Sequence, residues 1–198
     1  MKTLMTVLFA LSTTLSAVAA DKPMAATYKI DPATTTVKWV GKKVTGQHAG
    51  TVAVKTGNLV FTGDLITAGE IDVDMNSLTV TDIPATDENN AKLVGHLKSP
   101  DFFNVGKYPD AKLVITGSQK SKTGLKIKGN LTMIGKTAPV EFDAKVTKND
   151  TTATAKSDIT IDRTKWELKY GSGDFFKGLG DKAIHNEFVI SVDVTAKK

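Results

Sequence analysis

Residues 125–146 read LKIKGNLTMIGKTAPVEFDAKV, and this stretch carries the pattern that decides the fold. Apolar residues, with one glycine, stand at every second position from Leu125 to Met133 and again from Val140 to Val146. Successive side chains of a β-strand point to opposite faces, so this alternation is typical of strands with one buried face and one wet face. The stretch therefore predicts antiparallel strands.

The same alternation continues on both sides of this stretch. It recurs at residues 37–39, 52–54, 59–61, 71–75, 113–115, 159–161 and 188–194. Turn-forming residues at 55–58, 68–69, 122–124 and 148–150 separate the strand patterns, which predicts mostly hairpins. About eight strands with few helices leave two all-β architectures open, a sandwich and a closed barrel.

The alternation stops at residues 96–113, HLKSPDFFNVGKYPDAKL. Ser99-Pro100 is typical of a helix start, and Asp87 can cap a short helix just before it, with residues 93, 94 and 97 on one face. Asp-Phe-Phe occurs at residues 101–103 and again at residues 174–176. Two adjacent rings in a polar loop are costly unless buried, so both segments are expected to lie close together with their rings packed against the barrel, one of them shaping its mouth.

Residues 1–20 have the features of a secretory signal peptide. Lys2 is followed by a mostly apolar run from residue 4 to residue 18, and small residues follow. This run is shorter than the about 20 residues that a membrane span needs. We expect cleavage after Ala19 or Ala20, a periplasmic location, and one domain over residues 21–198.

Composition narrows the classes of partner and chemistry. The chain has no cysteine, which excludes disulfides and thiol nucleophiles, and its formal net charge is +5. Its lysines are spread along the strands, which favours solubility over nucleic-acid binding and allows transient contact with a membrane surface. The oligomeric state stays open between monomer and homodimer.

No catalytic or metal-binding pattern stands out. The three histidines, His48, His96 and His185, do not have the spacing of metal ligands, and no nucleophile elbow or phosphate loop is present. The sequence therefore predicts a protein that is not an enzyme and that has no cofactor or metal.

The inward-facing positions of the predicted strands are almost all apolar. They fill a barrel or line a cavity inside it, since a barrel of about eight strands is just wide enough for either. Assigned by their phase within each strand, together with one ring of the second Asp-Phe-Phe segment, the predicted wall residues are Trp39, Phe61, Ile71, Val73, Met75, Leu113, Ile127, Leu131, Met133, Phe142, Ile161, Phe176, Phe188 and Ile190. A strand bulge is expected at Gly129.

Four blocks of the sequence resemble the YceI family of lipid- and polyisoprenoid-binding proteins. Beside HLKSPDFF…KYP, they are WVGKKVTGQHAG at 39–50, GNLTMIGKTAPVEF at 129–142 and IDRTKWELKYGSGDFF at 161–176. Many members carry an Arg-Asp pair before the His-Leu, where this chain has Val94-Gly95. Any polar contact that the pair makes in those members is therefore not expected in this chain. The resemblance implies an extended, lipocalin-like antiparallel barrel with an apolar tunnel for a long lipid.

Two functions follow as expectations. The first is a periplasmic carrier holding a polyisoprenoid, an isoprenoid quinone or a fatty-acid-like chain, bound through burial of its CH₂ groups. The second is an enzyme, or an enzyme accessory, acting on a lipid or quinone with histidines at the mouth. The single arginine, Arg163, is expected either to clamp Asp162 or another carboxylate or to contact a ligand head group together with Lys169 and Tyr170.

Overall fold

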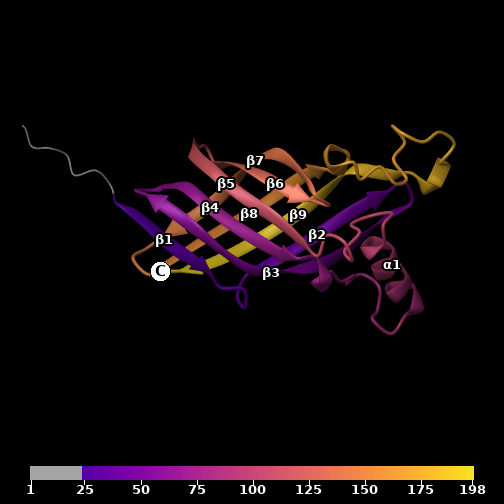
Figure 1. The fold of residues 1–198 in the computed structure, drawn as a ribbon, viewed down its shortest axis with the longest axis horizontal. Coiled ribbons are helices and arrows are strands. Elements are labelled where there is room, and N and C mark those ends of the chain that lie inside the picture. Colours follow the sequence, from indigo (N-terminus) through magenta and orange to yellow (C-terminus); the bar gives the residue numbers. More distant parts are fainter. Residues whose placement is uncertain (1–23) are drawn as a thin grey trace, which may run out of the picture.

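The computed structural model describes residues 24–198 of the chain, and the predicted signal peptide lies outside them. The described part contains nine antiparallel strands that wind around one axis (Figure 1). They are β1 (Ala25–Ile30), β2 (Thr36–Lys43), β3 (Gly46–Thr62), β4 (Leu65–Asp74), β5 (Asp110–Ser121), β6 (Gly124–Met133), β7 (Lys136–Lys148), β8 (Thr152–Asp162) and β9 (Ile184–Lys197).

The strands close into a barrel. β2 to β9 form a ring of eight, because each pairs with the next and β9 returns to β2, where Val37 faces Val192. At the end of the barrel where β2 begins, β1 lies between β3 and β9 in place of β2. The predicted antiparallel barrel of about eight strands is therefore confirmed, and the sandwich alternative is excluded.

Two of the predicted turns are wrong. Residues 55–58 and 68–69 lie inside β3 and β4, and the real turn between these strands is at 63–64, where Gly63 has a φ of 58°. Glycine serves here for close packing, because a Cβ at Gly57 would lie 2.7 Å from the carbonyl oxygen of Glu70. Both mispredicted segments coincide with bulges in the β3–β4 ladder, which explains their turn-like composition.

The bulge predicted at Gly129 is in fact on the neighbouring strand. Gly129 itself keeps regular register, and the shift falls opposite it on β5, between Ile115 and Gly117. Strand β1 at residues 25–30 was not predicted at all, because its short apolar pattern has few repeats.

One α-helix interrupts the barrel, α1 (Glu88–Lys98), together with the short 3-10 helices η1 (Met75–Ser77), η2 (Arg163–Trp166) and η3 (Gly180–Lys182). Asp87 caps α1 as predicted, since its carboxylate accepts a hydrogen bond from the Asn89 amide at 2.8 Å. Ser99-Pro100 does not start a helix. Ser99 ends α1, and its hydroxyl donates to the His96 carbonyl at 2.8 Å. Across residues 24–198, no helix combines the length and hydropathy required to cross a membrane.

The two ends of the barrel differ. At the end beside β1 and the C-terminus, side chains such as Tyr28, Ile30 and Phe61 are buried, and the rings of Tyr28 and Phe61 meet edge to face at 5.4 Å. The opposite end of the barrel carries α1 and the loop between β8 and β9 (Figure 1). Trp166, Leu168 and Phe102 form a second core cluster there.

Candidate functional site

An apolar cavity of about 380 Å³ runs inside the barrel from the second core cluster toward the first. Ligand pockets in proteins commonly measure about 300–1,000 Å³, so this cavity is large enough for a small molecule or a slender chain. All eight strands of the ring contribute to its wall, and α1, η1 and the turn after α1 cover one end. Its surface is formed almost entirely by carbon.

The barrel is hollow along this cavity and filled only at the β1 end. Inward-facing Trp39, Val73 and Phe188 retain partial accessibility although they lie inside a closed ring. Phe61, which points the same way nearer the β1 end, is only 1% exposed. Inward side chains stay accessible only when they face empty space, so the cavity alternative holds over the filled-core alternative.

The cavity opens at the end where α1 lies. Four of its wall residues are exposed, Lys42, Lys43, His185 and Glu187, and all four lie at the facing ends of β2 and β9. His48 and His96 lie on the same part of the wall. We call this opening, bounded by Lys42, Lys43, His48, His96, His185 and Glu187, the mouth. It is predominantly basic, whereas the rest of the wall is apolar apart from Ser157 and the buried Arg163.

The three histidines share the mouth, but each has a separate environment. His48 Nδ1 lies 2.8 Å from the Asp82 carboxylate. The His96 ring packs edge to face on Tyr170 and Phe102, with ring centres 4.8 and 5.4 Å away. Among residues 24–198, no cluster of three or more His, Cys, Asp or Glu side chains is arranged to hold a metal ion.

One rim of the mouth is sealed by residues 77–83, which we call the strap. β4 pairs with β3 only from Ala53 onward, so the first part of β3 has β2 on one edge and no strand on the edge that faces β4. Strap side chains take that place. Ser77 accepts from the Ala53 amide at 2.7 Å, Thr79 from Thr51 at 3.3 Å, and Asp82 from Ala49 at 2.8 Å. In return, strap amides donate to the Thr51 and Ala49 carbonyls.

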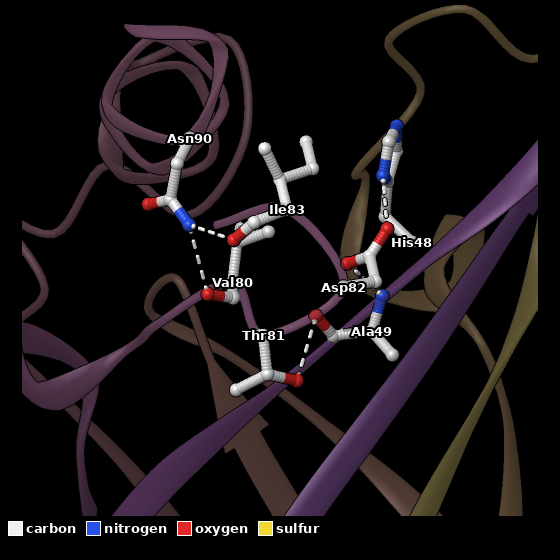
Figure 2. A network of polar contacts seen from close by, with 7 residues as sticks. All are labelled: His48, Ala49, Val80, Thr81, Asp82, Ile83 and Asn90. Atoms are coloured by element: carbon white, nitrogen blue, oxygen red, sulfur yellow. Dashed lines mark hydrogen bonds and ion pairs between the residues drawn. The ribbon is translucent and has the colours of Figure 1, made fainter. Parts of the chain in front are cut away.

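The strap is also fastened to α1 and to the cavity wall. The Asn90 side chain of α1 donates to the carbonyls of Val80 and Ile83, at 3.0 and 2.7 Å (Figure 2). The indole of Trp39 donates to the Thr79 carbonyl at 3.2 Å, directly over Gly50. A Cβ at Gly50 would lie 1.8 Å from that carbonyl oxygen, so only glycine allows the strap to approach β3. The strap thereby fixes α1 over the cavity.

Arg163 is buried, only 3% exposed, at the start of η2. It does not clamp a carboxylate, so that expectation is wrong. Its guanidinium donates instead to three backbone carbonyls, those of Ile184 and His185 at 3.1 Å each and that of Leu168. Asp162 caps η2, accepting from the Thr164 amide and hydroxyl. Burial lowers the pKa of Arg163, while the charge of Asp162 opposes that shift.

Comparison with known proteins places these features in a family. Residues 28–196 match the YceI-like domain. The chain belongs to the YceI family. Protein YceI of Escherichia coli is 32% identical over 142 residues, which cover 64% of this chain and 65% of that protein. The first curated relatives are matched over less than two thirds of their own length, from 44% to 66%.

Solved structures show the same fold. BcnA from Burkholderia cenocepacia superposes with a TM-score of 0.63 at 20% identity, covering 84% of this chain and 99% of that one. A polyisoprenoid-binding domain from Saccharophagus degradans gives a TM-score of 0.61 at 13% identity, covering 86% of this chain and 97% of that domain.

The four sequence blocks that resemble the YceI family meet at the mouth end. Residues 39–50 form the β2–β3 hairpin beside the mouth, residues 96–109 end α1 and enter β5, residues 129–142 form the β6–β7 hairpin, and residues 161–176 leave β8. Trp39, Phe102, Met133, Ile161 and Trp166 bring all four blocks into the second core cluster. In this YceI-family chain the recognisable sequence is therefore concentrated around the entrance to the cavity.

The structure places all but two of the predicted wall residues on the cavity wall. Phe61 is buried beside Tyr28 at the β1 end of the barrel, outside the cavity wall, and Phe176 lies outside the barrel, 49% exposed. Several in-phase strand residues were missed, such as Val52 and Val140, and they could have been found by extending the alternation. The alternation could not have identified Phe102, Phe103 and Leu97, because they reach the cavity from the segment without strand periodicity.

The two Asp-Phe-Phe segments of this YceI-family chain differ, contrary to expectation. Phe102 and Phe103 line the cavity, but Phe175 and Phe176 are 48% and 49% exposed. Tyr170 links the second segment to the first, with its ring 5.8 Å from that of Phe102. Lys169 and Tyr170, the predicted head-group contacts, are both exposed and are not part of the cavity wall.

Acid should loosen the strap at Asp82. Burial acts to raise the pKa of this carboxyl, but hydrogen bonds from the Ala49 amide and from His48 outweigh it and leave the pKa below its ordinary 3.8. The stabilisation is therefore present above pH 3.8 and is lost as the pH falls through the lowered pKa. We expect hydrogen-exchange protection of the Ala49 amide to fall in that window.

The Thr51 amide is a matched internal control for this measurement. It is held by the Thr79 hydroxyl, which does not titrate. Asp82→Asn keeps an acceptor for Ala49 but removes the charge, so protection in this variant should no longer depend on pH in that range. Equal loss of protection at Ala49 and Thr51 in the parent would contradict a local role for Asp82.

Proposed function

We propose that this protein binds one long apolar lipid, of the polyisoprenoid, isoprenoid-quinone or fatty-acid class, inside the barrel. The observation that carries the proposal is a continuous apolar cavity with polar groups gathered at a single open end. Each buried CH₂ group contributes about 0.8 kcal/mol, so a chain that fills the cavity is held by its length, without a dedicated polar contact. The polyisoprenoid-binding domain of similar fold supports this choice of ligand.

A polar head group would rest at the mouth, among Lys42, Lys43, His48, His96 and His185. The apolar end would point toward the plug formed by Tyr28 and Phe61, which blocks the far end. This orientation follows from burial, since the wall below the mouth offers few partners for a charged or strongly hydrated group.

Native mass spectrometry of the purified protein tests the proposal. We expect a mass above that of the polypeptide, and the extra species should extract into organic solvent as a lipid with one long chain. A protein that carries no adduct, and takes up no isoprenoid or fatty acid when offered one, would contradict binding. Turnover of a lipid or quinone that is lost in His96→Ala would instead establish the enzyme alternative.

We propose a periplasmic location as well, on the strength of residues 1–20 and their similarity to a signal peptide. N-terminal sequencing of the periplasmic fraction should find a chain that begins at Ala20 or Asp21. A folded pool that retains Met1 in the cytoplasm would contradict export.

A further inference from the structure

Exposed apolar side chains gather beside the mouth. Among residues 24–198, six large hydrophobic side chains are exposed, and four of them are Val44 (58%), Tyr170 (44%), Phe175 (48%) and Phe176 (49%). Val44 lies at the tip of the β2–β3 hairpin, and the other three lie in the loop between η2 and β9. We call this surface, formed by residues 42–46 and 169–183, the docking face.

One hydrogen bond joins the two segments of the docking face, and another closes the loop of the longer segment. The Val44 amide donates to the Ala183 carbonyl at 3.1 Å, and the Ile184 amide donates to the Gly171 carbonyl at 2.8 Å. Beneath the rings, Ser172 is fully buried, and its carbonyl accepts from the amides of both Phe175 and Phe176. Its hydroxyl bonds to Asn186 at 2.7 Å, and Asn186 donates to Asp174 at 2.6 Å. The loop is thus built to hold the two rings outward.

The charge of the docking face is unbalanced in the same place. Its exposed lysines are Lys42, Lys43, Lys169, Lys177 and Lys182, and in the described part of the chain none of them forms an ion pair with a carboxylate. Several lysines on the barrel wall do, although others there, such as Lys38 and Lys145, do not. Lys112 pairs with Glu70 and Asp72, Lys128 with Glu141, and Lys156 with Asp193. Lys169 Nζ lies 4.8 Å from the centre of the Phe175 ring, so a positive charge and an exposed aromatic ring lie side by side on the docking face.

The docking face adjoins the cavity. Lys42 and Lys43 belong to both the face and the cavity wall. The ring of Tyr170 contacts His96 and Phe102, and both of those line the cavity. A surface that covers the docking face therefore also covers the mouth.

We propose that the docking face binds the surface of an anionic lipid bilayer, with Phe175, Phe176 and Val44 entering the interfacial region and the lysines contacting the head groups. Half-exposed aromatic rings among unpaired lysines match the requirements of that interface, where apolar burial and attraction to anionic lipids add. Each lysine close to such a surface raises affinity about fivefold. The purpose of this contact, loading the barrel directly from the bilayer, rests on the proposed lipid binding, but the contact itself does not.

Co-sedimentation with vesicles tests the contact. We expect the protein to bind anionic vesicles made of a mixture of phosphatidylglycerol and phosphatidylcholine. Vesicles of phosphatidylcholine alone should bind at least tenfold more weakly. Phe175→Ser with Phe176→Ser should reduce binding at least tenfold, because both rings lose their burial in the interface. Lys177→Glu with Lys182→Glu should do the same, and added salt should weaken the parent.

Matched changes far from the mouth serve as controls. Val114→Ser removes an exposed apolar side chain from the barrel wall, and Lys122→Glu changes the charge in the hairpin at the opposite end. Both should bind vesicles like the parent. If these controls lose as much binding as the docking-face variants, the attraction is unspecific and the proposal fails.

The docking experiment can be separated from the cavity experiment. Phe175→Ser with Phe176→Ser should retain any co-purified lipid, since neither ring lines the cavity. A parent that does not bind anionic vesicles overturns the docking face, whatever the cavity holds. So does a parent that self-associates in sedimentation velocity through the same two rings, because the docking face would then be an interface between two copies.

Discussion

Val73→Trp is expected to abolish lipid binding while the barrel still folds. Val73 faces inward from β4 near the mouth, between Val54 of β3 and Ala111 of β5. Its side chain borders empty space, so an indole there can occupy the volume that a lipid chain would use. We expect retention of a long-chain isoprenoid to fall at least a hundredfold, with a loss of unfolding free energy below about 2 kcal/mol. Lipid titration and urea unfolding measure the two quantities.

Val114→Trp is the matched control for this change. Val114 lies on the neighbouring strand β5 and points away from the cavity, so the added ring meets solvent. Binding in this variant should equal that of the parent. Two results would show that the cavity is not the site. The first is that Val73→Trp binds lipid as well as the parent, and the second is that the variant is severely destabilised and no added lipid restores its stability.

Arg163→Met should cause a large loss of stability at the mouth end of the barrel. Methionine matches the arginine stem in length but removes the guanidinium that donates to the carbonyls of Leu168, Ile184 and His185. Each buried group left unsatisfied costs about 1–3 kcal/mol, so we expect a loss of roughly 3–5 kcal/mol in urea unfolding. The loop after η2 should also lose hydrogen-exchange protection.

Arg163→Lys tests whether geometry or charge is responsible. Lysine keeps the positive charge but lacks the planar fork that reaches three carbonyls at once, so it should recover at most about half of the loss. Full recovery by lysine would assign the effect to charge. A loss below about 1 kcal/mol in Arg163→Met would contradict the structural role.

The sequence predicted the strands well because alternation depends on local physics, whereas the choice of a barrel over a sandwich came from the resemblance to the YceI family. Residues such as Leu125, Ile127 and Met133 show their burial through their spacing alone. Turns inside β3 and β4 were mispredicted because Gly57 and Gly69 have the composition of a turn, whereas their role is close packing against Glu70 and Asn58. That role depends on which strands become neighbours, and spacing does not contain this information.

The site was predictable only in part, for a related reason. The phase of each strand placed most wall residues correctly, but whether the barrel is hollow depends on how side chains from all eight strands fit together. The partners of Arg163 are backbone carbonyls, which every residue has, so no sequence pattern marks them. Phe102 and Phe175 occupy identical local motifs, yet only tertiary packing makes one ring buried and the other exposed.

The closure of the barrel by β9 has a consequence for how the chain folds. β2 and each strand after it lie beside their successors in the chain, whereas β9 must also return to β1 and β2 near the other end of the sequence (Figure 1). Contacts between such distant segments form late, because loop closure must come first. Until then, β2 and β8 have open edges that can pair with another chain. The last 14-residue strand therefore decides between a monomeric barrel and an open, aggregation-prone sheet.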